Sequence, residues 1–166
     1  MKRVLSRRSA ADTAEPTDKA LFLDLDGTVR KTLVKGKFCP SKPEEQAVLE
    51  GRHEKLWEYK KQGYKIFAVT NQGGIGLGLM SKAECEECLE DLNSKLDGVF
   101  DDMLYAPAMP MRNDDFTKPN PGMIFHLAEK HKIDLKKSLM VGDRDTDQMA
   151  ARRGGVPFTW AKDFFK

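Results

Sequence analysis

Residues Phe22–Thr28, which read FLDLDGT, combine an apolar run with two carboxylates and a glycine. The apolar run predicts a buried parallel strand covered on both faces, where isolated Asp residues are unfavourable. Asp24 and Asp26 are two positions apart, so the strand pleat places both side chains on one side at the strand's carboxyl end. Like charges held so close require a cation, and a divalent ion with oxygen ligands, such as Mg2+, meets that requirement. A carboxylate there can also act as a nucleophile, whereas the alternative interpretation is a simple Asp-Gly turn.

Segments with strand and helix patterns alternate along the rest of the chain. We predict four further strands, at 64–70, 99–106, 138–142 and 156–160, and four helices, at 43–61, 81–96, 121–132 and 145–153. This alternation indicates parallel pairing with right-handed crossovers. The predicted fold class is therefore α/β, a doubly wound three-layer Rossmann-like sandwich with a central, mainly parallel sheet. Ligands bind at the carboxyl ends of such strands, so the residues that follow each strand should converge on one site.

The length and composition fit one domain, because 166 residues suffice for a single core with several strands. Lys and Arg number 28 against 26 Asp and Glu, and a formal net charge of +2 gives no argument for nucleic acid or membrane. We predict a flexible basic N-terminal tail at 1–18 and the folded domain at 19–166.

Cysteine usage and hydropathy favour a reducing, cytoplasmic setting. The chain has three cysteines, no signal-peptide pattern and no apolar run of membrane length, so no membrane partner is expected. Cys85 and Cys88 have CxxC spacing but lack a second ligand pair, so we expect no zinc.

Polar residues also follow the other predicted strands. Thr70 and Asn71 open a glycine-rich loop that reads GGIGLG at 73–78, where a hydroxyl and backbone amides can cradle phosphate oxygens. A flexible turn has the same composition. Lys118 stands just before the rigid turn PNPG at 119–122, and a cation there would stabilise the charge on a phosphoryl group. A solvated loop lysine is the alternative.

Residues 140–147 read MVGDRDTD and repeat the opening pattern of an apolar strand that ends in acids. Asp143 is placed as a second ligand of a divalent ion, and Arg144 is a candidate for contact with substrate. Asp145 and Asp147 both suit the N-terminus of the following helix, and we assign the cap to Asp145.

These four segments, in this order, resemble the motifs of the haloacid dehalogenase superfamily, whose members are mainly Mg2+-dependent phosphatases. DLDGTV at 24–29 is similar to the first motif, TNQGGI at 70–75 to the second, KP at 118–119 to the third and VGDRDTD at 141–147 to the fourth. The resemblance implies that Asp24 attacks phosphorus and that Asp26 is the general acid and base, because related ATP-driven pumps carry Thr in its place. It also implies phosphate-binding residues (Thr70, Asn71, Lys118 and Arg144), metal ligands (Asp24, Asp143 and, through its backbone carbonyl, Asp26) and a supporting residue (Asp147).

The resemblance narrows the substrate to three classes. About forty residues separate the first two motifs, too few for the large cap that often sets specificity in this superfamily. Capless relatives with the TNQ string include polynucleotide 3'-phosphatases, heptose bisphosphate phosphatases and histidinol phosphate phosphatases. The two small-molecule groups typically carry a Cys and His zinc loop before the lysine, and residues 105–113 contain neither residue type.

Two features favour a DNA or RNA 3' end as the substrate. Residues 155–165 are similar to the C-terminus of polynucleotide phosphatases, and four basic residues are expected to flank the entrance: Arg30, Lys31, Lys35 and Lys37. The sequence thus predicts a Mg2+-dependent phosphomonoesterase with an aspartyl-phosphate intermediate and favours a polynucleotide 3'-phosphatase. A phosphatase for D,D-heptose 1,7-bisphosphate or histidinol phosphate is the alternative. A phosphotransferase and a non-catalytic phosphate-binding protein are more distant interpretations.

Overall fold

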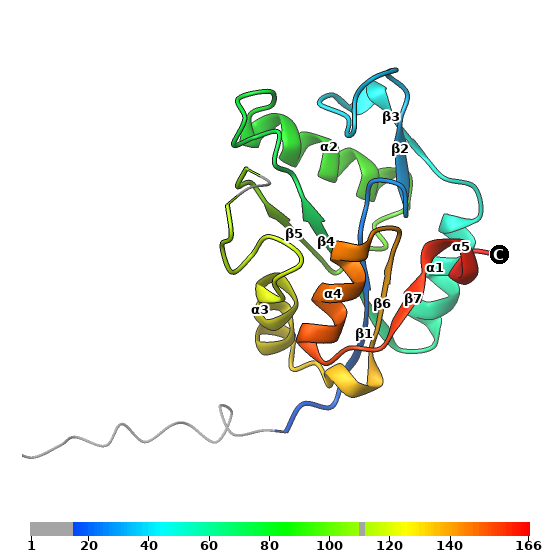
Figure 1. Cartoon of the computed structure of the whole chain (residues 1–166). Coiled ribbons are helices and arrows are strands. Elements are labelled where there is room, and N and C mark those ends of the chain that lie inside the picture. The colour runs from blue at the N-terminus through cyan, green and yellow to red at the C-terminus, as the bar shows by residue number, and fades with distance from the viewer. Residues whose placement is uncertain (1–14, 110–111) are drawn as a thin grey trace, which may run out of the picture.

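The central sheet has five parallel strands in the order β5-β4-β1-β6-β7 (Figure 1). The strands are β1 (Lys19–Leu23), β4 (Tyr64–Asn71), β5 (Asp102–Ala106), β6 (Leu139–Gly142) and β7 (Phe158–Trp160). They come from a computed structural model that describes residues 15–109 and 112–166. The predicted α/β class with a parallel sheet is therefore confirmed.

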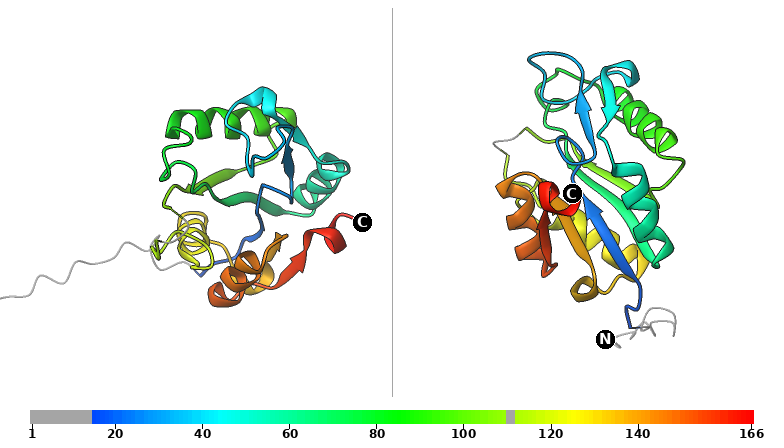
Figure 2. Two further views of the ribbon diagram at one scale, coloured as in Figure 1. Left: turned by 45° about the horizontal axis from the view of Figure 1, so that its top comes forward. Right: turned by 90° about the vertical axis from the view of Figure 1, so that its right-hand side faces the viewer.

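Helices cover both faces of this sheet, and Figure 2 shows the three layers edge on. One face carries α1 (Arg52–Lys61), α2 (Lys82–Lys95) and α5 (Ala161–Phe164), and the other carries α3 (Gly122–His131) and α4 (Asp145–Gly154). The strand pleat divides the core accordingly: Leu21 and Leu23 pack under the first group, and Ala20 and Phe22 under the second. All four side chains are fully buried, as a central parallel strand requires.

The order of the strands determines where along the sheet a ligand site can form. The chain runs from the central strand β1 outward to β4 and β5, then returns across the sheet to β6 and β7. The direction of winding reverses beside β1, so the segments that follow β1, β4 and β6 meet at one edge of the sheet. This edge carries all four motifs that the sequence singled out, because the lysine loop leaves the carboxyl end of β5 on its way to α3.

The prediction of a helix over 43–61 was wrong in its first half. A short 3-10 turn, η2 (Pro43–Glu45), leads into β3 (Gln46–Val48), which pairs antiparallel with β2 (Arg30–Thr32). The helix α1 begins only at Arg52, after Gly51 with a φ of 78°. Tertiary contacts override the helix propensity of residues 43–50, because the buried Gln46 side chain binds Arg30 and the α2 backbone.

The other element boundaries differ by a few residues. Strand β5 begins at Asp102 rather than 99, and the acidic residues at its start are paired: Asp101 accepts from the Ile66 amide at 2.8 Å, and Asp102 binds Lys130 and His131. The short helix α5 was not predicted, and neither was the 3-10 turn η3 (Leu135–Lys137).

The proposed division of the chain at residue 18 lies at the start of the sheet. Most of the predicted tail, residues 1–14, is outside the described residues. Asp18 itself hydrogen-bonds to the backbones of Lys132 and Asp134, so it is attached to the domain. Among the described residues, no helix is long and apolar enough to cross a membrane.

Candidate active site

A buried lysine joins two acidic residues at the carboxyl edge of the sheet. The Nζ of Lys118 donates to Oδ1 of Asp24 at 2.8 Å and to Oδ1 of Asp147 at 2.7 Å. Asp24 follows β1, Asp147 lies in the first turn of α4, and Lys118 comes from the loop before α3. All three side chains are nearly inaccessible to water. The solvated-loop interpretation of Lys118 is therefore wrong.

The electrostatics of this group keep the lysine charged. Burial lowers the pKa of Lys118, but the charges of Asp24 and Asp147 and their hydrogen bonds raise it more, so the net pKa is above its ordinary value. Burial, reinforced by the charge of Asp24, raises the pKa of Asp147 even though Lys118 opposes this change. The site therefore holds one ammonium between two carboxylates that compete for it.

Asp143, the residue after β6, faces the first motif directly. Partial burial, followed by interaction with Asp24 and the charge of Asp147, raises its pKa to about 7. Gly27 approaches it so closely that a Cβ at this position would overlap the Asp143 carboxylate. The φ of Gly27 is 85°, a left-handed conformation that favours glycine. Glycine is thus required twice over at this point of the DLDGT segment.

Three of these carboxylates form a candidate metal site. Asp24, Asp143 and Asp147 each offer one oxygen, and these oxygens lie within 4.8 Å of one another. Oxygen-only ligands suit a hard divalent ion such as Mg2+. The site has four acidic residues, Asp24, Asp26, Asp143 and Asp147, and two buried cations, Lys118 and Arg30. When all six are ionised, their formal charge is minus two. One divalent cation would balance that charge, so the residues present fit the ion.

Asp26 points to a different set of partners. Arg30 grips both of its oxygens, with Nε 3.0 Å from Oδ1 and Nη2 3.2 Å from Oδ2. The side-chain amide of Gln72 donates to Oδ2 at 2.9 Å and to the Thr70 hydroxyl at 2.8 Å. The Asp26 side chain is accordingly absent from the three-carboxylate group, and its predicted role as a metal ligand concerns its backbone carbonyl alone.

The expectation that Arg30 flanks the entrance was wrong. It is 1% exposed, whereas Lys31 and Lys35 are exposed as expected, and Lys37 pairs with Glu45. In the sequence Arg30 resembles the nearby lysines in charge, and nothing local shows that the β2–β3 hairpin buries it. The spacing of four residues from Asp26 was the available clue.

In the second motif, the neighbouring residues Thr70 and Asn71 make different contacts. Thr70 is buried at the end of β4, with its hydroxyl against Gln72. Asn71 holds the lysine loop: its Nδ2 donates to the Lys118 carbonyl at 3.0 Å, and its Oδ1 accepts from the Lys118 amide at 2.9 Å. The Asn71 side chain thus positions Lys118, and its contact with phosphate stays a prediction.

The fourth motif also differs from expectation in one respect. The carboxylate of Asp147, not that of Asp145, closes the start of α4, because its Oδ2 accepts from the backbone amides of Asp143 and Arg144, both at 3.1 Å. Asp147 therefore fastens the metal-ligand loop and Lys118 at once. Arg144 is exposed beside the site, where a substrate can reach it.

Sequence reasoning missed three residues that support the motifs. Thr28 donates to Oδ2 of Asp24 at 3.3 Å, and Gln46 and Gln72 are buried beside Arg30 and Asp26. Gln72 could have been found, because it follows Thr70 by two positions in the TNQ string. Gln46 carried no such sign, since it stands in a segment with a helical pattern.

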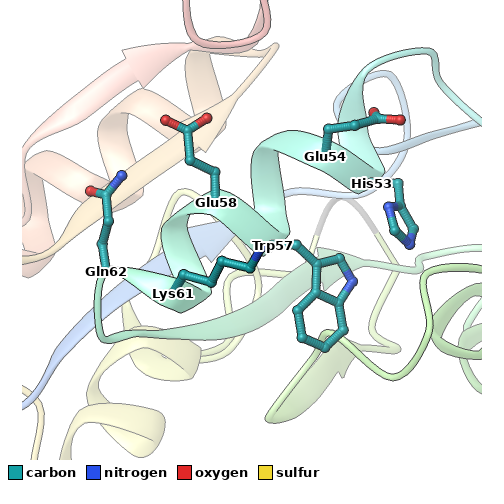
Figure 3. A pocket seen from close by; sticks show the side chains of 6 residues that line it. All are labelled: His53, Glu54, Trp57, Glu58, Lys61 and Gln62. Atoms are coloured by element: carbon teal, nitrogen blue, oxygen red, sulfur yellow. The ribbon is translucent and has the colours of Figure 1, made fainter.

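A separate depression of about 510 Å³ runs along α1. Figure 3 shows Glu54 and Glu58 on one side of this helix and His53 and Trp57 on the other. His53 binds Asp97 at 2.6 Å, and the Trp57 ring nitrogen donates to the Leu96 carbonyl, so both side chains serve to pack α1 against the loop after α2. The groups that could do phosphoryl chemistry are those at the strand ends.

Solved structures share this arrangement of strands and helices. D,D-heptose 1,7-bisphosphate phosphatase from B. bronchiseptica, crystallised with magnesium and phosphate, superimposes with a TM-score of 0.76 at 26% identity, covering 84% of this chain and 78% of that one. A putative haloacid dehalogenase-like phosphatase from Mesorhizobium loti gives a TM-score of 0.75 at 30% identity, covering 85% of this chain and 70% of that one. This fold with this site defines an enzyme, a phosphatase of the haloacid dehalogenase superfamily.

Residues 19–165 match the sequence profile of the family described as polynucleotide kinase 3 phosphatase, and the chain belongs to that family. Named relatives point to a smaller substrate than the family description does. A probable D-glycero-D-manno-heptose-1,7-bisphosphate 7-phosphatase of Thermoplasma volcanium is 33% identical over 144 residues, which cover 84% of this chain and 96% of the relative. D-glycero-beta-D-manno-heptose-1,7-bisphosphate 7-phosphatase of Helicobacter pylori strain J99 is 33% identical over 148 residues, 84% of this chain and 80% of the relative. These relatives favour the heptose bisphosphate alternative over the DNA or RNA 3' end that the sequence analysis preferred.

Proposed function

We propose that this protein is a Mg2+-dependent phosphomonoesterase that hydrolyses a heptose 1,7-bisphosphate through an aspartyl-phosphate on Asp24. The observation that carries the mechanism is the buried Lys118 that joins Asp24 to Asp147, next to Asp143. The substrate proposal is supported by the heptose bisphosphate phosphatases among the relatives and structural neighbours.

The residues that hold the phosphoryl group surround Asp24. Lys118 and the Thr70 hydroxyl supply positive charge and a hydrogen bond at the group being transferred, which is where charge develops in the transition state. Asp24, Asp143 and the Asp26 carbonyl would hold Mg2+, while Asp147, the third carboxylate of the group, binds Lys118. When bound, the ion supplies charge neutralisation for the carboxylates and the phosphoryl oxygens.

The reaction has two displacements. In the first, a carboxylate oxygen of Asp24 bonds to phosphorus, the ester P–O bond breaks, and Asp26 gives a proton to the departing alcohol oxygen. In the second, Asp26 takes a proton from water as the water oxygen bonds to phosphorus. The bond between phosphorus and Asp24 then breaks, and inorganic phosphate and free Asp24 result.

The access to this site suits a substrate recognised by loops. The described residues between β1 and β4 form only the β2–β3 hairpin, η2 and α1, so they provide no large cap. Arg144, exposed beside Asp143, is placed to bind an anionic part of the substrate beyond the reacting phosphate, such as the second phosphate of a bisphosphate.

The test compares phosphate release from three substrates in the presence and absence of Mg2+: D,D-heptose 1,7-bisphosphate, histidinol phosphate and a 3'-phosphorylated oligonucleotide. Asp24→Asn serves as the blank. We expect the highest kcat/KM for the heptose bisphosphate, and Arg144→Ala should raise its KM. A clear preference for either other substrate would overturn the substrate proposal and keep the phosphatase. Mg2+-independent release, or equal release by Asp24→Asn, would overturn the mechanism.

A further inference from the structure

Arg30 is the largest fully buried side chain of the described residues, and it is committed to the proton-transferring acid. Its Nε and Nη2 bind the two oxygens of Asp26 at 3.0 and 3.2 Å, a side-by-side arrangement that matches the planar guanidinium to the planar carboxylate. The Asp26 side chain is 16% exposed and that of Arg30 only 1%. Substrate can therefore reach Asp26 but cannot reach Arg30.

The burial of this guanidinium is supported from α2. The remaining donor group, Nη1, binds Oε1 of Gln46 at 3.0 Å. The Gln46 amide in turn donates to the Cys88 carbonyl and to the Asp91 carboxylate, both at 2.8 Å. A buried cation is costly unless its hydrogen bonds are satisfied, and here a chain of contacts runs from α2 through the hairpin to Asp26. This chain fixes where the guanidinium lies.

A second group fixes Asp26 from the strand β4. Gln72, also 1% exposed, donates to Oδ2 of Asp26 and to the Thr70 hydroxyl. Within the described part of the chain, Oδ2 thus accepts two hydrogen bonds and Oδ1 accepts one. Each carboxylate oxygen has two lone pairs, so the oxygen with an open position is Oδ1.

We propose that Arg30 is a positioning residue for Asp26, which it holds so that Oδ1 exchanges the proton with the substrate and with water. This inference rests on the proposed function, in which Asp26 is the general acid and base. Arg30 acts without touching substrate. It removes the freedom of the Asp26 side chain and orients the free lone pair, and such preorganisation matters most in the step that moves a proton.

The test separates proton transfer from the other parts of catalysis by leaving-group chemistry. p-Nitrophenyl phosphate and benzyl phosphate are similar in size, but the nitrophenolate leaves without a proton, whereas benzyl alkoxide needs one. For Arg30→Gln we expect kcat/KM to fall about 100-fold with benzyl phosphate, the lower range for loss of general acid catalysis, and less than about tenfold with p-nitrophenyl phosphate. The KM for each ester should change little. The kcat/KM of Arg30→Lys with benzyl phosphate should lie between those of the wild type and Arg30→Gln, because one ammonium cannot hold both oxygens of Asp26.

A control removes a more exposed ion pair at the opposite end of the sheet. Lys60 binds Asp101 at 3.1 Å there, and Lys60→Gln should slow both esters equally or not at all. Gln46→Met removes the hydrogen bond to Arg30 together with those to Cys88 and Asp91, but it leaves the pair of Arg30 and Asp26 in place. It should show the same selectivity as Arg30→Gln in milder form, and it serves where Arg30→Gln is too unstable to purify. Equal losses on both esters in the Arg30 and Gln46 variants would overturn this inference while leaving the phosphatase intact. A wild-type enzyme that releases phosphate with Mg2+ from neither ester and not from D,D-heptose 1,7-bisphosphate would overturn the proposed function and this inference together.

Discussion

The Nζ of Lys118 lies 2.8 Å from Oδ1 of Asp24, although 94 positions separate the two residues in the chain. The contact is almost completely buried, so the ammonium is shielded from solvent and interacts with the groups of the site. Two neighbours hold it: Asn71 binds the backbone of Lys118, and Asp147 binds its side chain. The orientation of Asp24 is thus set by three segments of the chain, and this arrangement gives rise to the predictions that follow.

Replacing the proposed nucleophile should stop turnover without unfolding the protein. Asp24→Asn keeps the shape of the side chain but removes the charge that attacks phosphorus, so phosphate release should fall by about 1,000-fold or more. Thermal unfolding measured alongside should show a folded protein with a cooperative transition. Residual activity within tenfold of wild type would contradict the role of Asp24.

Removing the buried ammonium should destabilise the fold. Lys118→Met leaves the carboxylates of Asp24 and Asp147 buried beside each other without a cation, a change that typically costs about 3–5 kcal/mol. Urea unfolding in buffer without Mg2+ measures the free energy of unfolding. The control is Lys130→Met, because Lys130 also binds an acid, Asp102, but its side chain is 57% exposed and such pairs contribute about 0–1 kcal/mol. Equal losses in the two variants would contradict the buried role of Lys118.

The stability of the metal-free protein should depend on Asp143 in a defined direction. The pKa of this carboxyl is raised from 3.8 to about 7 by burial and by neighbouring carboxylates. Between these two values the folded state binds more protons than the unfolded state, so this group lowers stability as pH rises from about 4 to about 7. Mg2+ requires the ionised carboxylate, and its stabilising effect should therefore be larger at pH 8 than at pH 5.5.

Thermal unfolding across this pH range, with and without Mg2+, tests the Asp143 prediction. Asp143→Asn should reduce the fall in stability and remove most of the response to Mg2+, since it removes one of the titrating groups and a ligand together. A variant that keeps the wild-type response to Mg2+ would show that Asp143 is not a ligand.

Two glycines with nearly the same φ allow the effect of steric overlap to be compared. Gly27 has a φ of 85° and Gly36 a φ of 86°, but a Cβ on Gly36 would meet nothing within 4 Å. Gly36→Ala should cost about 1–2 kcal/mol from the left-handed conformation alone. Gly27→Ala should cost more than this and should also lower Mg2+-dependent turnover, because the new methyl group displaces Asp143. Similar behaviour of the two variants in urea unfolding and phosphate release would contradict this account.

The parts of the site that could be predicted are those that stand next to a strand in the sequence. Asp24 and Asp143 each follow a short apolar run, and Thr70 ends another, so the parallel-sheet rule alone brings them to one edge. The local pattern around Lys118, a cation before a Pro-rich turn, was weaker evidence for a functional role. The sequence did not indicate that Lys118 is buried. Asp145 and Asp147 looked equivalent as caps, and only the turn geometry of α4 distinguishes them.

By itself, the sequence determined the α/β class and which strands end in polar residues suited to catalysis. It also showed that position 26 is an Asp, which favours a phosphatase. These follow from local patterns: hydrophobic runs, their period and the residues that end them. Only the tertiary structure decided that Arg30 is buried, that residues 46–48 form a strand and that Asn71 holds the lysine loop. The physical reason is that burial and pairing depend on partners far away in the chain, here α2 for Gln46 and Arg30, and the loop before α3 for Asn71. Local propensity contains no information about such partners.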